Sequence, residues 1–182
     1  VEPYVVVPDA GSINGGKAGA LVGPGFGKAG TPEDGFMFVT SMLNCALYKV
    51  TPRREIWPWI IGDEAHSGMR FMPRWLYRAP ESWGKFAGQL VCEGVKNHSF
   101  SSAAPKPGEA PLKEEIVFFT VEDQGYGKLA KITQFDAAGL PTVEVFDAPG
   151  AVSGRNDGYA APQGFGPFAG QRPVPARGQP VR

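Results

Sequence analysis

Two glycine-rich segments near the N-terminus have the spacing of nucleotide-binding loops. Residues 11–17 match Gly-x-x-x-x-Gly-Lys and follow a short apolar stretch, residues 4–7. A phosphate loop also needs a hydroxyl for magnesium, where Ala18 stands, and a helix that the following glycines disfavour. Residues 25–30 match Gly-x-Gly-x-x-Gly, but Pro24 precedes them where a strand should lead into the loop. In a chain with 25 glycines, we interpret both as chance matches within a glycine-rich arm.

The acidic and histidine residues give a weak indication of metal or nucleophile chemistry. Asp63, Glu64 and His66 lie within four residues, and His98 is the only other histidine. A metal site needs three or four ligands that converge in space, and this spacing matches no established pattern. Cys92 and His98 could form a nucleophile–base pair, but no third group in the sequence orients them. We therefore expect exposed turn residues here, with no catalytic residue, no metal and no cofactor.

Two further groups of reactive side chains have simpler interpretations. Cys45 and Cys92 form no Cys-x-x-Cys motif, and we expect two buried free thiols, since Cys is among the most buried residue types. Acidic residues bracket residues 115–122, and at strand ends such groups typically oppose aggregation rather than act as acid–base pairs.

The segment that most strongly indicates binding is rich in aromatic and arginine residues. If residues 70–78 form a regular strand, one face carries Phe71, Trp75 and Tyr77, and the other carries Arg70, Arg74 and Arg78. Trp57 and Trp59 lie upstream, next to Arg53 and Arg54. This composition is typical of protein–protein hot spots, of a core strand with a solvated arginine face, and of stacking platforms for single-stranded nucleic acid. Strict alternation separates the aromatic from the basic face, which disfavours a single nucleic-acid groove.

Two helices are expected between the glycine-rich start and residue 96. Residues 31–34 combine a capping Thr, a Pro and two acids, which is a helix-start signal. Apolar residues then recur at helical spacing from Phe36 to Val50, although the stretch is apolar nearly all round and a buried strand is the alternative. A second amphipathic helix is predicted from Ser82 to Val95, weakened by three internal glycines.

The clearest secondary-structure pattern lies further along the chain. Residues 115–122, 129–135 and 142–146 have strand character and are separated by Gly-containing turns. This spacing predicts an antiparallel meander. The sequence therefore predicts an α+β fold in which an antiparallel β-meander packs against one or two helices within a compact domain, residues 32–148.

The two ends of the chain have a different composition. Residues 1–31 are glycine-rich, and residues 149–182 contain many glycines and prolines with no Ile, Leu or Met. Such segments cannot build a core of their own, so we expect extended arms that bind neighbouring surfaces. The predicted contact residues of the C-terminal arm are its large aromatic and basic side chains: Arg155, Tyr159, Phe165, Phe168, Arg172 and Arg177.

Whole-chain properties narrow the function. The 182 residues have a formal net charge of zero, which gives no global attraction to nucleic acid or an anionic membrane. No apolar run is long enough to predict a transmembrane helix. We expect a non-enzymatic structural or accessory subunit of a coat, shell or multi-subunit complex, with other protein subunits as partners. The alternatives are a single-stranded nucleic-acid-binding module using residues 53–83, and an enzyme using Asp63, Glu64 and His66.

Overall fold

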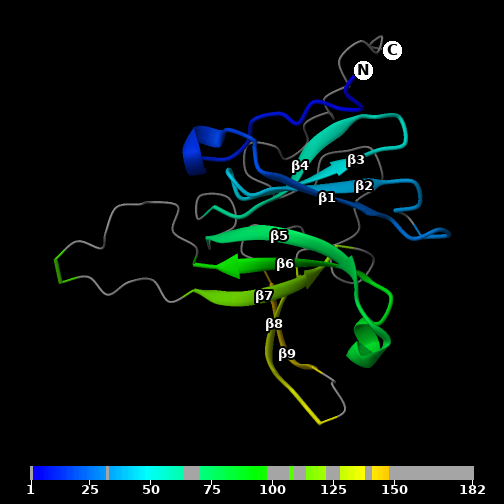
Figure 1. Cartoon of the computed structure of the whole chain (residues 1–182), viewed down its shortest axis with the longest axis vertical. Helices are drawn as coiled ribbons and strands as arrows, with labels where there is room; N and C mark the ends of the chain where they lie inside the picture. Colours follow the sequence, from blue (N-terminus) through cyan, green and yellow to red (C-terminus); the bar gives the residue numbers. More distant parts are fainter. Residues whose placement is uncertain are drawn as a thin grey trace.

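A computed structural model describes residues 2–31, 33–63, 70–97, 107–108, 114–121, 128–137 and 141–147. These residues form two antiparallel sheets (Figure 1). The first sheet has the order β1-β2-β3-β4, with β1 at Leu21–Phe26, β2 at Met37–Ser41, β3 at Ala46–Val50 and β4 at Ile56–Ile61. The second sheet has the order β5-β6-β7-β8-β9, with β5 at Phe71–Arg78, β6 at Leu90–Lys96, β7 at Glu115–Thr120, β8 at Lys128–Phe135 and β9 at Pro141–Asp147.

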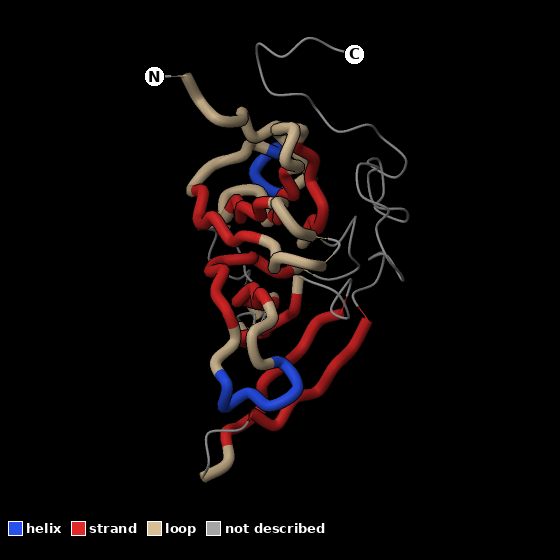
Figure 2. The backbone as a smooth tube through the Cα atoms, turned by 90° about the vertical axis from the view of Figure 1, so that its right-hand side faces the viewer, coloured by secondary structure: helices blue, strands red, loops and turns tan. Residues whose placement is uncertain are grey.

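Helical structure in the described residues is limited to two short 3-10 helices. They are η1 at Ile13–Gly16 and η2 at Glu81–Phe86, and they lie at opposite ends of the molecule (Figures 1 and 2). The predicted α+β class, with helices packed on a sheet, is therefore wrong, and the described chain is mostly β. Both predicted helices are replaced by strands, for different physical reasons.

The predicted helix over residues 36–50 is instead the β2–β3 hairpin. Its turn, residues 42–45, ends at Cys45, whose φ is +54°, a conformation that no α-helix contains. The strands pair in register from Met37 opposite Val50 to Ser41 opposite Ala46. All five residues of β3 are buried, so both of its faces need apolar side chains. A strand buried on both faces lacks the period-2 pattern, and that is why its apolar residues also fitted helical spacing.

The predicted helix over residues 82–95 divides into η2 and β6. Gly84 inside η2 and Gly88 two residues after it have positive φ, at +56° and +74°, which an α-helix does not contain. Glycine adopts this region readily and other residues rarely do. Two of the glycines that weakened the helix prediction therefore interrupt the helical path before β6 begins at Leu90.

The predicted antiparallel meander is confirmed. β7, β8 and β9 occupy the three expected segments and pair as consecutive antiparallel neighbours. The β8–β9 hairpin extends away from the rest of the molecule (Figure 1). The end of β9 at Asp147 is also the end of the described chain, so the predicted C-terminal arm, residues 149–182, lies outside the described residues.

The two sheets meet where β5 lies beside β1 and β2. The Thr40 hydroxyl lies 2.7 Å from the carbonyl oxygen of Arg74 and 3.1 Å from that of Val22, which links the sheets. A Cβ at Gly25 would lie 3.0 Å from Leu90 and 3.2 Å from Leu76, so β1 approaches the second sheet closely at this glycine. Aromatic contacts fill the core on either side, with Phe38 against Trp59 in the first sheet and Phe71 against Phe119 in the second.

The N-terminal segment covers part of the first sheet. Val5, Val7 and Ala10 belong to the same apolar cluster as β3 and β4. The Tyr48 hydroxyl donates to the Pro8 carbonyl oxygen at 2.6 Å. The residues expected to form an N-terminal arm, 1–31, therefore include a segment packed on the first sheet and, in β1, one of its strands.

Candidate interaction surface

A cluster of aromatic side chains lies on the outer side of the second sheet. Tyr77 of β5, Trp83 of η2 and Phe118 of β7 contact one another edge to face, with ring centroids 5.3–6.5 Å apart. Trp75 and Ile116 lie two residues from Tyr77 and Phe118 on the same strands, so they share this side. Trp75 is 56% exposed and Ile116 is 46% exposed. We call these five residues, Trp75, Tyr77, Trp83, Ile116 and Phe118, the aromatic face.

A β-bulge in β5 creates this surface. Pro73 pairs with Gly94, but Leu76 pairs with Cys92, so β5 contains one extra residue between these positions. The extra residue reverses the alternation of the strand. Phe71 before the bulge is fully buried in the core, whereas Trp75 and Tyr77 after it face outward. A regular strand would have placed all three on one side, as the sequence analysis assumed.

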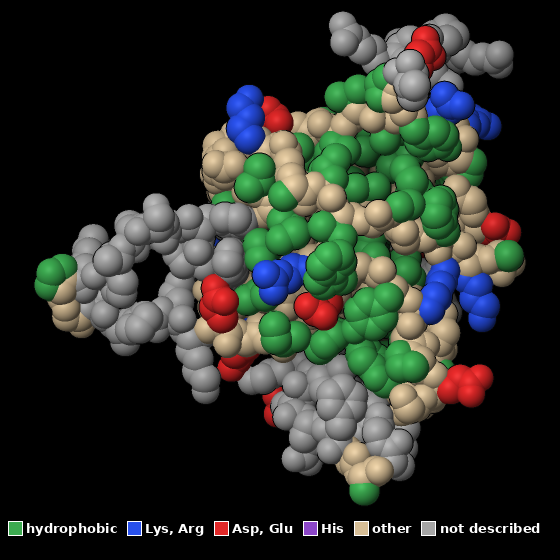
Figure 3. Space-filling model, viewed as in Figure 1, with side chains coloured by type: hydrophobic (Ala, Val, Ile, Leu, Met, Phe, Trp, Pro, Cys, Tyr) green, Lys and Arg blue, Asp and Glu red, His purple; other side chains and the backbone are tan. Residues whose placement is uncertain are grey.

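Hydrophobic side chains gather over the second sheet in the space-filling view, with basic and acidic side chains among them (Figure 3). Glu93 is an acidic group beside the aromatic face, because it lies directly opposite Phe118 in the β6–β7 ladder. Burial, and secondly the negative charge of Glu93, raise the pKa of Tyr77. Tyr77 therefore offers a neutral hydroxyl beside a half-buried carboxylate.

The arginines of β5 do not form one basic face. Arg78 hydrogen-bonds to the Gly88 carbonyl oxygen at 3.2 Å and also to that of Phe26, so it ties the loop after η2 to β1. Arg74 is half-buried beside the bulge, and Arg70 is half-buried just before the strand begins. Of the three, Arg78 alone is exposed, and its guanidinium group is bound to backbone carbonyl oxygens.

Three of the predicted contact residues lie in the core. Trp57 and Trp59 of β4 are each 2% exposed, and Phe71 is fully buried. The predicted residues that lie at the surface are Trp75, Tyr77, Arg74, Arg78 and Arg70. Sequence reasoning missed Trp83, Ile116, Phe118 and Glu93. The sequence does contain a signal for Ile116 and Phe118. Residues 116–119 are apolar at every position, whereas a strand with one face toward the core and the other toward solvent alternates apolar and polar residues.

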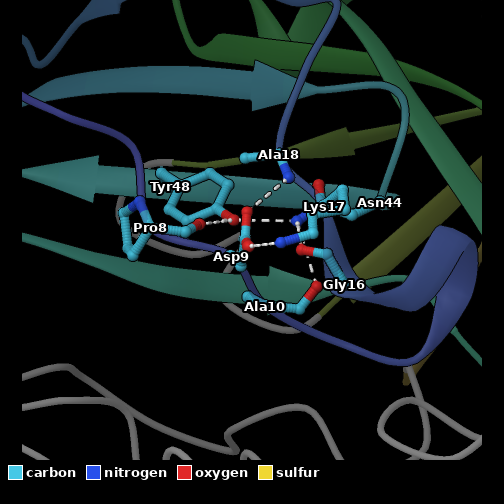
Figure 4. A network of polar contacts seen from close by, with 8 residues as sticks. All are labelled: Pro8, Asp9, Ala10, Gly16, Lys17, Ala18, Asn44 and Tyr48. Atoms are coloured by element: carbon cyan, nitrogen blue, oxygen red, sulfur yellow. Dashed lines mark hydrogen bonds and ion pairs between the residues drawn. The ribbon is translucent and has the colours of Figure 1, made fainter.

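The loop that resembles a phosphate loop is closed by its own polar contacts (Figure 4). Lys17 Nζ lies 2.8 Å from Asp9 Oδ2, and the Ala18 amide donates to Asp9 Oδ1 at 3.0 Å. The Ala10 amide donates to the Gly16 carbonyl oxygen at 2.7 Å. The lysine that a nucleotide site would aim at phosphate is thus paired with a carboxylate, and Asp9 in turn raises the pKa of Lys17.

Asn44 and Asp63 hold this loop on the first sheet. The buried Asn44 amide nitrogen lies 3.0 Å from the Ala10 carbonyl oxygen, 3.1 Å from that of Gly16 and 2.9 Å from the Tyr48 hydroxyl. The buried Asp63 Oδ2 accepts from the Ser12 amide at 2.6 Å and from the Ser12 hydroxyl at 2.8 Å. These groups order a glycine-rich segment that has no intrinsic structure, so their role is structural.

The residues considered for metal or nucleophile chemistry are not brought together in the described chain. Asp63 is buried and engaged with Ser12, while Glu64, His66 and His98 lie outside the described residues. No group of three or more potential metal ligands occurs in the part of the chain that the structure describes. Cys45 and Cys92 are both free and buried, which confirms that prediction, and burial raises the pKa of each thiol.

One buried charge was not anticipated from the sequence. Lys49 of β3 is 1% exposed, and its Nζ lies 4.5 Å from the ring centroid of Phe36, 5.5 Å from that of Trp59 and 6.0 Å from that of Phe38. Burial lowers its pKa to about 8, against the opposing effect of the fully buried Glu33. With almost no access to solvent, this amine is a core group rather than a reactive one.

Comparison with known proteins identifies no relative of this chain. The chain matches no protein-family model, no curated protein and no solved structure. Within the described residues, no helix has the length and apolar character needed to cross a membrane. The aromatic face is therefore the main indication of function.

Proposed function

We propose that this protein is a non-enzymatic structural or accessory subunit of a larger protein assembly, such as a coat, a shell or a multi-subunit complex. It docks on other protein subunits through the aromatic face and through its C-terminal arm. The observation that supports this most directly is the exposure of Trp75 and Ile116 beside three further aromatic side chains on one side of the second sheet. Tryptophan and tyrosine dominate the energetics of protein interfaces.

The organisation of the rest of the chain supports the same function. Lys49, Cys45 and Cys92, whose pKa values burial shifts, lie in the core, where no substrate reaches them. Glycine- and proline-rich arms lie flat on existing surfaces, and proline reduces the entropy lost on docking. The nucleic-acid alternative ranks lower because Trp57, Trp59 and Phe71 lie in the core and are not available for stacking on bases.

Light scattering of the full chain over a wide concentration range tests the proposal. We expect the mass to rise above that of a monomer, and the double variant Trp75→Ser/Ile116→Ser to lower it. Tyr4→Ser is the matched control, because Tyr4 is an exposed aromatic residue of the N-terminal segment, at 49% exposure. A chain that stays monomeric throughout, and that instead binds single-stranded oligonucleotides with a steep salt dependence, contradicts the proposal.

A further inference from the structure

We propose that the aromatic face binds the C-terminal arm, residues 149–182, of a second copy of this chain. The inference rests on the proposed function and names its partner. It is carried by three observations: the chemistry of the face, the chemistry of the arm and the length of the arm.

The face combines apolar surface with one negative charge. Trp75 and Ile116 supply exposed apolar area, and the half-buried Glu93 lies opposite Phe118 and close enough to Tyr77 to affect its ionisation. The aromatic rings around a carboxylate attract a cation in two ways, by ion pairing with the carboxylate and by contact with the ring faces. The ligand that fits such a surface is a segment that carries both aromatic and arginine side chains.

The arm has this composition. It contains three aromatic residues, Tyr159, Phe165 and Phe168, and four arginines against one acid, Asp157. Because the whole chain has a formal net charge of zero, the residues before the arm carry an equal excess of acidic groups. The arm and the body of the molecule are therefore complementary in charge. Arginine also stacks on tryptophan and tyrosine better than lysine does, and the arm contains no lysine.

The arm is long enough to reach another molecule. The arm follows β9, whose last residue is Asp147. An extended proline-rich segment spans about 3.1 Å per residue, so the arm reaches roughly 100 Å. Each copy carries one face and one arm, and such a head-to-tail contact generates a ring or a filament. Exchange of arms between copies is thus a direct route to the assembly proposed above.

Site-specific disulfide trapping in the full chain tests the contact. Because Cys45 and Cys92 are buried, a cysteine introduced at the surface reacts selectively. A size-tagged Ile116→Cys chain is mixed with an untagged Phe168→Cys chain and oxidised. We expect a disulfide-linked heterodimer, about tenfold more abundant than with Leu21→Cys in place of Ile116→Cys. Leu21 is the matched control because it is 51% exposed and lies on β1, outside the aromatic face.

The charge of Glu93 provides a second measurement that does not depend on a large change in the fold. Adding Glu93→Gln to the Ile116→Cys chain keeps the side-chain shape and removes the negative charge. We expect the heterodimer yield to fall about fivefold, because the arginine loses its ion pair but keeps the aromatic surface.

The outcomes separate this inference from the proposed function. A mainly intramolecular disulfide in the Ile116→Cys/Phe168→Cys double variant overturns binding between copies, as does an Ile116→Cys homodimer without any heterodimer. If no link to the arm forms while Trp75→Ser/Ile116→Ser still lowers the mass of the assembly, the arm is not the ligand and the proposed function stands. If the mass never exceeds that of a monomer, both fail.

Discussion

Lys49 is a buried charge whose protonation affects the stability of this fold. Its pKa falls from 10.5 to about 8 on folding because burial disfavours the ammonium form. Between these two values the unfolded chain binds more protons at this site than the folded chain, so Lys49 makes stability rise with pH in this window. Cys45 and Cys92 oppose this rise from about pH 8 upward, because burial raises the pKa of both thiols above 9.0. The effect of Lys49 is therefore measured against a variant that keeps both cysteines.

Urea unfolding at pH 7, 8 and 9 measures this effect. The double variant Glu33→Gln/Lys49→Met removes both buried charges and keeps both cysteines, so it serves as the reference. We expect the free energy of unfolding of the wild type to rise relative to that of the double variant by about 1 kcal/mol between pH 7 and pH 9, as a pKa of about 8 implies. A difference between the two profiles that stays constant or shrinks over this range would show that folding does not lower the pKa of Lys49.

Asn44 is the residue that connects the N-terminal segment to β3. Its amide nitrogen has three polar neighbours in a buried position, so Asn44→Ala leaves two carbonyl groups and a tyrosine hydroxyl without this donor. We expect a loss of about 2–3 kcal/mol in the free energy of unfolding, and faster hydrogen exchange at the Ala10 and Ala18 amides. Lys17→Met, in the same network but exposed, should change stability little. Equal effects of the two variants would contradict the structural role of Asn44.

The strands of the β7–β9 meander were predictable from the sequence because glycine-containing turns separate three short segments of strand character. β3 and β4 are buried on both faces, so their sequences show no alternation of polar and apolar residues. For this reason the β2–β3 hairpin was predicted as a helix. The bulge after Pro73 adds one residue to β5 and leaves no mark in composition. That single residue decides that Trp75 faces solvent while Phe71 lies in the core.

Gly62, between β4 and β5, gives a test at the scale of elements. Its amide donates to the Cys45 carbonyl oxygen at 2.7 Å, and its own carbonyl accepts from the Phe71 amide at 2.6 Å. A Cβ at this position would lie 2.0 Å from the Phe71 carbonyl oxygen, a backbone atom that cannot rotate away.

We therefore expect Gly62→Ala to lower the free energy of unfolding by about 3 kcal/mol or more. Gly25→Ala should cost less, about 1–2 kcal/mol, since the added methyl meets side-chain atoms of Leu90 at 3.0 Å that can shift. Denaturant unfolding of both variants measures the order. A Gly25 variant less stable than the Gly62 variant would contradict the described packing between the sheets.

At the level of the whole molecule, the two sheets carry different groups. The first sheet holds the buried tryptophans, Trp57 and Trp59, and the ordered N-terminal segment. The second sheet contributes Phe71 and Phe119 to the core and carries the aromatic face on its other side. The position of this face could not be predicted from the sequence, because it depends on the bulge and on Trp83 of η2 meeting β5 and β7 in space.

If the protein assembles through the aromatic face, this face becomes covered as the assembly forms. Acrylamide quenching of tryptophan fluorescence reports it, because Trp57 and Trp59 are already buried and Trp75 is the most exposed of the four tryptophans. We predict that quenching decreases as concentration raises the mass, and that Trp75→Phe removes most of this change. Quenching that stays constant while the mass increases would show that the molecules associate through another surface.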